Sequence, residues 1–167
     1  DISNFNTSGV TDMRYMFAGA TSFNQPLAED SVNGYWETGN VTNMSSMFEG
    51  ATSFNQDIDS WDVSGLVRMD SMFNGATLFN QDLNSWDVSN VLVARSLFES
   101  SAFNGDISSW DTSTLAATSR MFTDTPFNGS FGANWDTSQV TDFSSVFENA
   151  ASFNQSLENW DTSAATK

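Results

Sequence analysis

The chain has 167 residues, of which 21 are acidic and 5 are basic, giving a formal net charge of −16. This charge excludes a nucleic-acid partner, whose phosphates need Lys and Arg, and disfavours contact with an anionic membrane surface. Cys and His are absent, which excludes disulfides, a zinc site, a thiol nucleophile and an imidazole base. No apolar run approaches the roughly 18 residues that span a bilayer, so we expect no membrane insertion by this segment.

A repeat of about 25 residues organises the chain from end to end. Each copy carries a Phe-Asn dipeptide and then a Trp, which is followed by an acidic residue in every case. We predict a single array over residues 1–167, cut from a longer protein. Its six full repeats begin near Phe5, Trp36, Trp61, Trp86, Trp110 and Trp135, and a stub begins at Trp160.

The middle of each repeat has helical spacing. Val41, Met44, Met47 and Phe48 lie at i, i+3, i+6 and i+7, which predicts a short helix with one apolar face. Ser residues precede this pattern where an N-cap belongs, and Gly residues follow it where a helix ends. The expected caps are Ser64, Ser89, Ser113 and Ser138, and the expected ends are Gly19, Gly50 and Gly75.

The second half of each repeat lacks strict strand alternation. Phe54, Ile58 and Trp61 are spaced by four and three residues, so only two or three extended residues are expected per turn. The sequence therefore predicts a leucine-rich-repeat-like solenoid, with a short helix and a short extended segment in each unit, stacked in parallel. Six extra residues near Ala28 to Gly34 identify a loop.

The stretch FNQDIDSWDVSGLVRMDSMFNGATLFNQDLNSWDVSNV, residues 54–91, resembles the BspA-like repeats of bacterial surface proteins. These repeats are a divergent leucine-rich-repeat relative, marked by Met-Phe, Phe-Asn and Trp-Asp-Val-Ser. The resemblance implies an extracellular, surface-exposed or lipoprotein-attached array of the kind found in large adhesins. It implies no shared catalytic residue. The array departs from the pattern at Phe5, which replaces Trp, and at Ala94 and Leu97, which replace Met.

The Asn of each Phe-Asn dipeptide forms a polar row. We predict an internal amide ladder, in which each Asn donates to one turn and accepts from the next, because buried polar groups must be paired. A row of polar ligands is the alternative. The members are Asn24, Asn55, Asn80, Asn104, Asn128 and Asn154.

A second row holds the acidic residue after each Trp. Like charges about 4.8 Å apart repel by about 1 kcal/mol per pair in water, so something must offset them. We predict that each Asp accepts backbone N–H groups two residues on and faces a helix N-terminus. The row is Glu37, Asp62, Asp87, Asp111, Asp136 and Asp161.

Bound Ca²⁺, which takes six to eight oxygens, is the alternative offset for these charges. The weak candidate ligands are Asp57, Asp62, Asp82, Asp87, Asp106 and Asp111. No other cofactor is expected.

The Trp residues form a third row, which we predict to be stacked core in register with Ile58, Leu83 and Ile107. A platform for sugar rings is the alternative. The row is Trp36, Trp61, Trp86, Trp110, Trp135 and Trp160. The four Arg residues fall near the Met positions and are expected to pair with acids such as Asp70, which contributes little at a surface. They are Arg14, Arg68, Arg95 and Arg120.

Three functions follow from these observations. The favoured one is an extracellular cell-surface module for adhesion or for binding a protein or glycan ligand on a host or neighbouring cell. The alternative is a structural spacer of a large adhesin with no ligand of its own. A polysaccharide-acting enzyme using Asp57 and Asp59 as acid and base is remote, so we expect no enzymatic activity. Apolar terminal turns predict end-to-end self-association.

Overall fold

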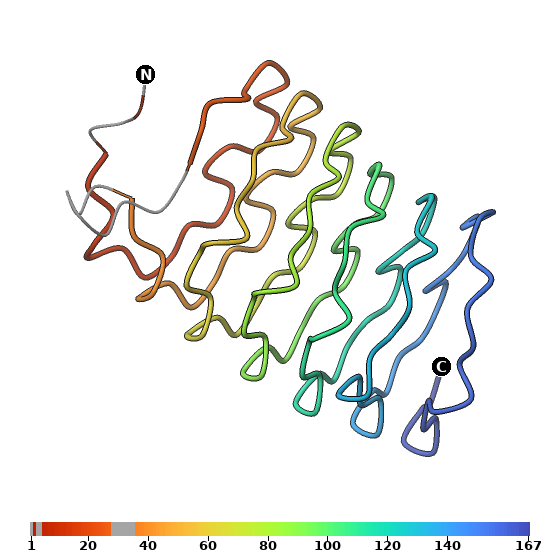
Figure 1. Cartoon of the computed structure of the whole chain (residues 1–167). Coiled ribbons are helices and arrows are strands. Elements are labelled where there is room, and N and C mark those ends of the chain that lie inside the picture. The colour runs from red at the N-terminus through yellow and green to blue at the C-terminus, as the bar shows by residue number, and fades with distance from the viewer. Residues whose placement is uncertain (1, 3–4, 28–35) are drawn as a thin grey trace.

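The computed structural model describes residues 2, 5–27 and 36–167. These residues form a stack in which each repeat runs out and back, and successive turns lie side by side along the chain (Figure 1). The described part contains no helix and no strand longer than a single paired residue. The pairing is parallel and runs from Asp12 to Asn43, Arg68, Val93, Ala117 and Asp142.

The prediction of a leucine-rich-repeat-like solenoid, with a helix and an extended segment in each unit, is therefore wrong. The helix-capping roles given to the Ser and Gly positions are wrong with it. The expected loop at Ala28 to Gly34 lies outside the described residues. None of the described segments is a helix long and apolar enough to cross a membrane.

The segment that was expected to be helical is a run of tight turns, which we call the bridge arm. It extends from each paired residue to the eighth residue after it: residues 12–20, 43–51, 68–76, 93–101, 117–125 and 142–150. Within residues 68–76, the N–H groups of Met69, Ser71, Phe73 and Gly75 donate to carbonyls of the next turn at 2.8–3.0 Å. The N–H groups of Met72 and Asn74 donate to the carbonyl three residues back, at 3.3 and 3.1 Å.

The spacing of the turns explains why no helix forms. A helix with its side chains is about 10 Å wide, whereas backbones joined by hydrogen bonds lie about 4.8 Å apart. Stacked Phe rings of successive bridge arms have centroids 5.7 Å apart, as for Phe48 and Phe73, which leaves no room for a helix. Ser71 and Gly75 also have positive φ, at 54° and 69°, and so turn the backbone out of the right-handed helical region.

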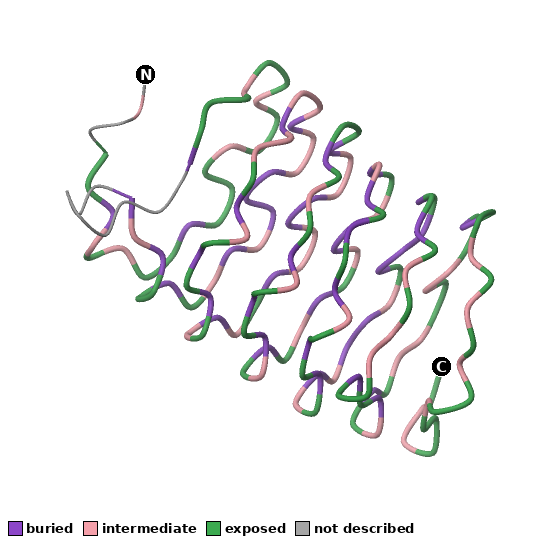
Figure 2. Ribbon diagram, viewed as in Figure 1, coloured by how far each residue is buried: buried purple, intermediate pink, exposed green. Residues whose placement is uncertain are grey.

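We call the other half of each repeat the Phe-Asn arm. It comprises residues 54–64, 79–89, 103–113, 127–138 and 153–163. The two arms meet in an apolar core, where Phe73 of the bridge arm stacks on Phe79 of the Phe-Asn arm with centroids 4.0 Å apart. Buried residues line both arms of the middle turns, whereas the last turn is mostly exposed or intermediate (Figure 2).

Candidate functional site

The structure places the Trp row in the core rather than on a surface that could bind sugar rings. Trp36, Trp61, Trp86, Trp110 and Trp135 are between 0% and 6% exposed, and Trp160 is partly buried. The indole N–H of Trp61 donates to the carbonyl of Leu27 in the preceding turn at 2.7 Å. Trp86 and Trp110 do the same with Ile58 and Leu83, at 3.0 and 2.8 Å. These three Trp residues therefore join successive turns from within the core, whereas Nε1 of Trp36 and of Trp160 is buried without a hydrogen-bond partner among the described residues.

The Asn row forms a chain of hydrogen bonds along the surface of the Phe-Asn arm. Each Oδ1 accepts the backbone N–H of the corresponding Asn in the next turn, as Asn55 does for Asn80 at 2.9 Å. The same bond recurs at 2.7–3.0 Å from Asn24 through Asn154. Apart from the half-buried Asn55 these side chains are exposed, so the ladder is not internal as we had expected. The bonded Oδ1 atoms are committed to backbone N–H groups and are poor candidates for ligand binding.

Each Asp of the acidic row closes a local turn. Asp62 Oδ1 accepts the N–H of Ser64 at 3.0 Å and its hydroxyl at 2.6 Å, and Asp87, Asp111, Asp136 and Asp161 accept the equivalent N–H at 2.8–3.1 Å. Hydrogen bonds from Ser64 hold the pKa of Asp62 below its ordinary value. With no helix in the described residues, the expected contribution of a helix N-terminus is wrong. Glu37 replaces Asp in this row, and its backbone N–H donates to the hydroxyl of Thr7 at 2.7 Å.

The candidate calcium ligands are also engaged in local hydrogen bonds. Asp57 Oδ1 accepts the N–H of Asp59 at 3.0 Å, and Asp82 Oδ1 accepts that of Asp106 at 2.8 Å. Asp106 Oδ1 accepts the N–H of Ser108 at 2.9 Å. Within the described residues no three acidic groups gather closely enough to hold a metal ion. A cation would have to compete with these bonds or use the second carboxylate oxygen of each residue.

Asp57 and Asp59, the alternative acid and base of an enzyme, each accept hydrogen bonds from neighbouring groups. Asp57 bonds to the backbone of its own turn, while Asp59 accepts the N–H and the hydroxyl of Ser85 in the next turn, at 2.9 and 2.7 Å. Both carboxylates therefore support turns, which is a structural role.

Charge is divided unequally between the two arms. The Phe-Asn arm carries carboxylates but no Lys or Arg. All four Arg residues lie on bridge arms, and Lys167 lies beside one, where its carbonyl accepts the N–H of Phe143. Arg14 pairs with Asp12 at 2.7 Å, Arg120 pairs with Glu99, and Lys167 lies 3.8 Å from Asp142. A ligand that is recognised by Lys or Arg side chains would therefore contact the bridge arms.

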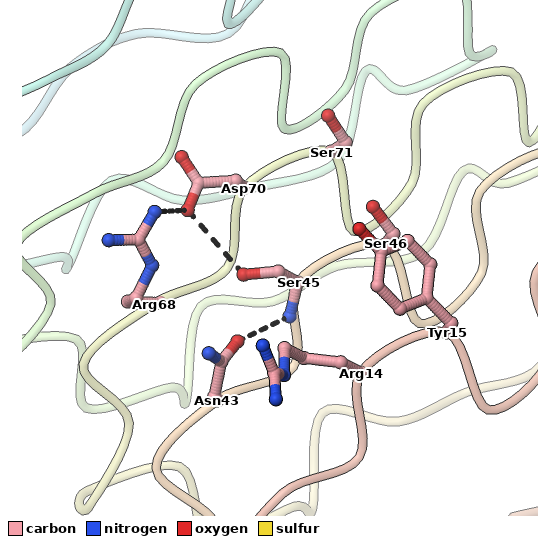
Figure 3. Close-up of a pocket in the computed structure, with 8 residues that line it drawn as sticks. All are labelled: Arg14, Tyr15, Asn43, Ser45, Ser46, Arg68, Asp70 and Ser71. Carbon is pink, nitrogen blue, oxygen red and sulfur yellow. Dashed lines mark hydrogen bonds and ion pairs between the residues drawn. The ribbon is translucent and has the colours of Figure 1, made fainter.

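Three bridge arms form a polar hollow of about 530 Å³ that is open to solvent (Figure 3). Arg14 and Tyr15 come from the first described turn, Asn43 and Ser45 from the second, and Arg68 and Asp70 from the third. Asp70 Oδ2 accepts from Arg68 Nη2 at 2.8 Å and from the hydroxyl of Ser45 at 3.4 Å. Arg95 approaches the other oxygen of Asp70 at 3.7 Å.

The hollow was missed by the sequence analysis, although a signal for it exists. At the position of Tyr15 the next three turns carry Ser46, Ser71 and Ser96. Arg14 likewise aligns with Ser45 in the second turn. Tyr15 and Arg14 thus differ from the adjacent turn, although Arg95 and Arg120 stand at the positions of Arg14 and Tyr15 in later turns. A consensus of recurring residues does not reveal such a hollow.

The sequence matches the family described as Mycoplasma protein of unknown function, DUF285, over residues 1–35, 28–133 and 103–167. The chain therefore belongs to this family. No curated protein and no solved structure matches the chain.

Proposed function

We propose that the chain is an extracellular cell-surface module that binds a protein or glycan ligand and so serves adhesion. The observation that carries the proposal is the polar hollow, where Arg14, Tyr15 and Arg68 gather on otherwise regular bridge arms. The resemblance of residues 54–91 to BspA-like surface repeats supports the extracellular location. The acidic groups form turns and the Trp row is core, which leaves this hollow as the best-supported place for ligand contact among the described residues.

Binding of the whole chain to glycan and protein arrays tests this proposal. A ligand retained at micromolar concentration, and lost on substitution in the hollow, is the expected result. A chain that binds nothing on either array at that concentration would count against adhesion.

A structural spacer is the second candidate, and a specific observation favours it. Phe rings stack from Phe17 to Phe147 without interruption, with centroids 5.5–5.8 Å apart. Such a continuous column suits a module that holds another domain away from the cell. Removing two repeats would then shorten the reach of the parent protein without changing its ligand affinity, and a clear loss of affinity would exclude this role.

End-to-end self-association is a further proposal for the partner of this chain. Phe147, Phe153 and Trp160 of the last described turn are only partly buried, unlike their counterparts in the middle turns. Sedimentation velocity at several protein concentrations tests it. A single monomeric species throughout would contradict it.

A further inference from the structure

The hollow on the first three described turns differs from the rest of the stack in its largest side chains. Tyr15 occupies a position held by Ser in three following turns, and Arg68 pairs across the bridge with Asn43. Most features of this chain recur in every turn and have a structural role. Arg95 and Arg120 stand at the positions of Arg14 and Tyr15 in later turns, but the combination of Arg14, Tyr15 and Arg68 around one hollow does not recur among the described turns. Ligand binding would explain that combination.

Both guanidinium groups of the hollow keep donors that the structure does not use internally. Arg14 bonds to Asp12 through Nε and Nη2, and Arg68 bonds to Asp70 through Nη2. Within the described residues no further bond is made by Nη1 of Arg14, or by Nε and Nη1 of Arg68. These side chains are 52% and 47% exposed, so their remaining N–H groups face solvent. A planar guanidinium is suited to a carboxylate, which it can bind through two parallel hydrogen bonds.

Tyr15 supplies an exposed ring at the same place. It is 63% exposed, and it shares its positive φ of 60° with the equivalent Ser46 and Ser71, so the backbone of the repeat turns its side chain outward. A large aromatic side chain held outward in this way combines an apolar face with a hydroxyl group. Asn43 Oδ1 accepts the N–H of Ser45, and the Asn43 amide nitrogen makes no hydrogen bond within the part of the chain that the structure describes, so it can donate to a hydroxyl of a ligand.

The charges around the hollow determine which kind of anion it can bind. Asp12 and Asp70 stand beside the two Arg residues, and the whole chain carries a charge of −16. A polyanion would also be repelled by carboxylates elsewhere on the chain, whereas a single carboxylate meets only the charges at the hollow, which are Arg14 and Arg68 with their partners Asp12 and Asp70, because salt screens charges beyond about 8 Å.

We infer that the hollow lined by Arg14, Tyr15, Asn43 and Arg68 binds a terminal sugar bearing one carboxylate, such as a uronic acid. The guanidinium groups receive the carboxylate, the Tyr15 ring packs against the C–H face of the sugar, and Asn43 and Ser45 bond to its hydroxyls. This inference rests on the proposed ligand-binding function and specifies its ligand class and its site.

Titration of the whole ¹⁵N-labelled chain with methyl β-D-glucuronide tests the inference, with the Arg Nε–H and backbone signals as reporters. The signals of Arg14, Tyr15 and Arg68 should shift and saturate at millimolar ligand, while Arg120, which lies outside the hollow, stays unchanged. Methyl β-D-glucoside and acetate should each bind at least about tenfold more weakly, since each lacks one half of the recognised ligand. Heparin should not bind more tightly than the monosaccharide.

The equivalent positions of neighbouring turns suggest which substitutions to test. Tyr15→Ser and Arg68→Asn install residues that the same positions hold in neighbouring turns, so both should fold. Each should weaken glucuronide binding about tenfold or more, whereas Arg120→Ser should leave it unchanged. Absence of saturation, equal shifts at Arg120, or unchanged binding by Tyr15→Ser would overturn the inference. An array ligand that binds independently of these variants would keep the proposed function and remove this site from it.

Discussion

The two arms of each turn are joined to their neighbours by different chemical groups. On the bridge arm the links are backbone bonds, as from the N–H of Phe73 to the carbonyl of Leu97 at 2.9 Å. On the Phe-Asn arm most links end on a side chain, as from the N–H of Asn80 to Asn55 Oδ1 at 2.9 Å. Backbone links require no particular side chain, but side-chain links require a specific one. This explains why an Asn follows the Phe of the Phe-Asn arm in every copy, while the outward positions of the bridge arm vary.

The difference also separates structure from proposed function. Because the bridge arm is held by its backbone, its outward side chains are free to change from turn to turn. The hollow around Tyr15 and Arg68 lies on this arm. The Phe-Asn arm commits its amides and carboxylates to turn formation, so a substitution there should cost stability before it alters binding.

The difference between the two arms is tested most directly by replacing one glycine on each arm with Ala. A Cβ at Gly105, on the Phe-Asn arm, would lie 2.2 Å from the backbone oxygen of Gln81, so the turns must separate. Gly105→Ala should destabilise the fold by about 3 kcal/mol. At Gly75, on the bridge arm, the nearest atom to a Cβ would be 3.7 Å away, but φ is +69°. Gly75→Ala should cost about 1 kcal/mol, from the left-handed backbone alone.

Urea unfolding followed by Trp fluorescence measures both values. Gly9→Ala is the control, because a Cβ there meets nothing within 4 Å. Equal losses for Gly105→Ala and Gly75→Ala would show that the close approach at Gln81 is not maintained in solution.

Two Asn residues of the same turn test whether side chains join the Phe-Asn arms while backbone groups join the bridge arms. Asn80 Oδ1 accepts the N–H of Asn104 at 2.7 Å, so Asn80→Ala leaves that donor unpaired. The expected loss is about 1 kcal/mol, because the exposed site lets water replace part of the bond. Asn74 lies on the bridge arm of the same turn, where the backbone makes the links, and Asn74→Ala should change stability by less than about 0.5 kcal/mol. Thermal unfolding by circular dichroism separates them, and similar losses would refute the distinction.

Acidification should weaken the Phe-Asn arm through its Asp turns. Hydrogen bonds from Ser64 and Ser113 hold the pKa values of Asp62 and Asp111 below the ordinary 3.8. A carboxyl with a lower pKa in the folded state stabilises the fold above its unfolded pKa, and this stability is lost as pH falls through the folded pKa. The melting temperature should therefore fall below about pH 5.

The double variant Asp62→Asn/Asp111→Asn keeps an acceptor oxygen in both turns but cannot be protonated in this range. Its melting temperature should fall by about 2 °C less than that of the parent chain between pH 6 and pH 3, because these groups are exposed and each contributes little. An identical pH dependence of the two chains would show that the Asp–Ser turns do not hold the charged form.

The sequence predicted the recurring side-chain rows more successfully than the backbone. An Asn in every copy and an Asp two residues before Ser in most copies identify positions where a specific side chain is needed, and the structure places hydrogen bonds there. The helix was wrong because the spacing of Met69, Met72 and Phe73 also suits a run of tight turns, in which bonds between turns override local propensity. Ser and Gly at positions such as 71 and 75, which both have positive φ, were the overlooked signal.

The hollow could not be predicted from the repeat. A consensus describes what the turns share, whereas Tyr15 and Arg68 are exceptions whose proximity depends on the stacking of three turns. Stacking brings residues about 25 and 50 positions apart onto one surface, and only the register of the bridge residues defines which ones meet.

The smallest expected effect concerns calcium and the acidic residues of the Phe-Asn arm. If side chains already join or close these turns, added metal has little left to stabilise: Oδ1 of Asp57, Asp82 and Asp106 each accepts a backbone N–H. We therefore expect the same melting temperature in Ca²⁺ and in EDTA at matched ionic strength, since only a ligand that binds the folded state raises it. A saturable rise with Ca²⁺ but not with Mg²⁺ would mean that the second carboxylate oxygens bind metal between turns. The turns of the Phe-Asn arm would then be joined partly by an ion, and Asn80→Ala should lower the free energy of unfolding by less when calcium is present.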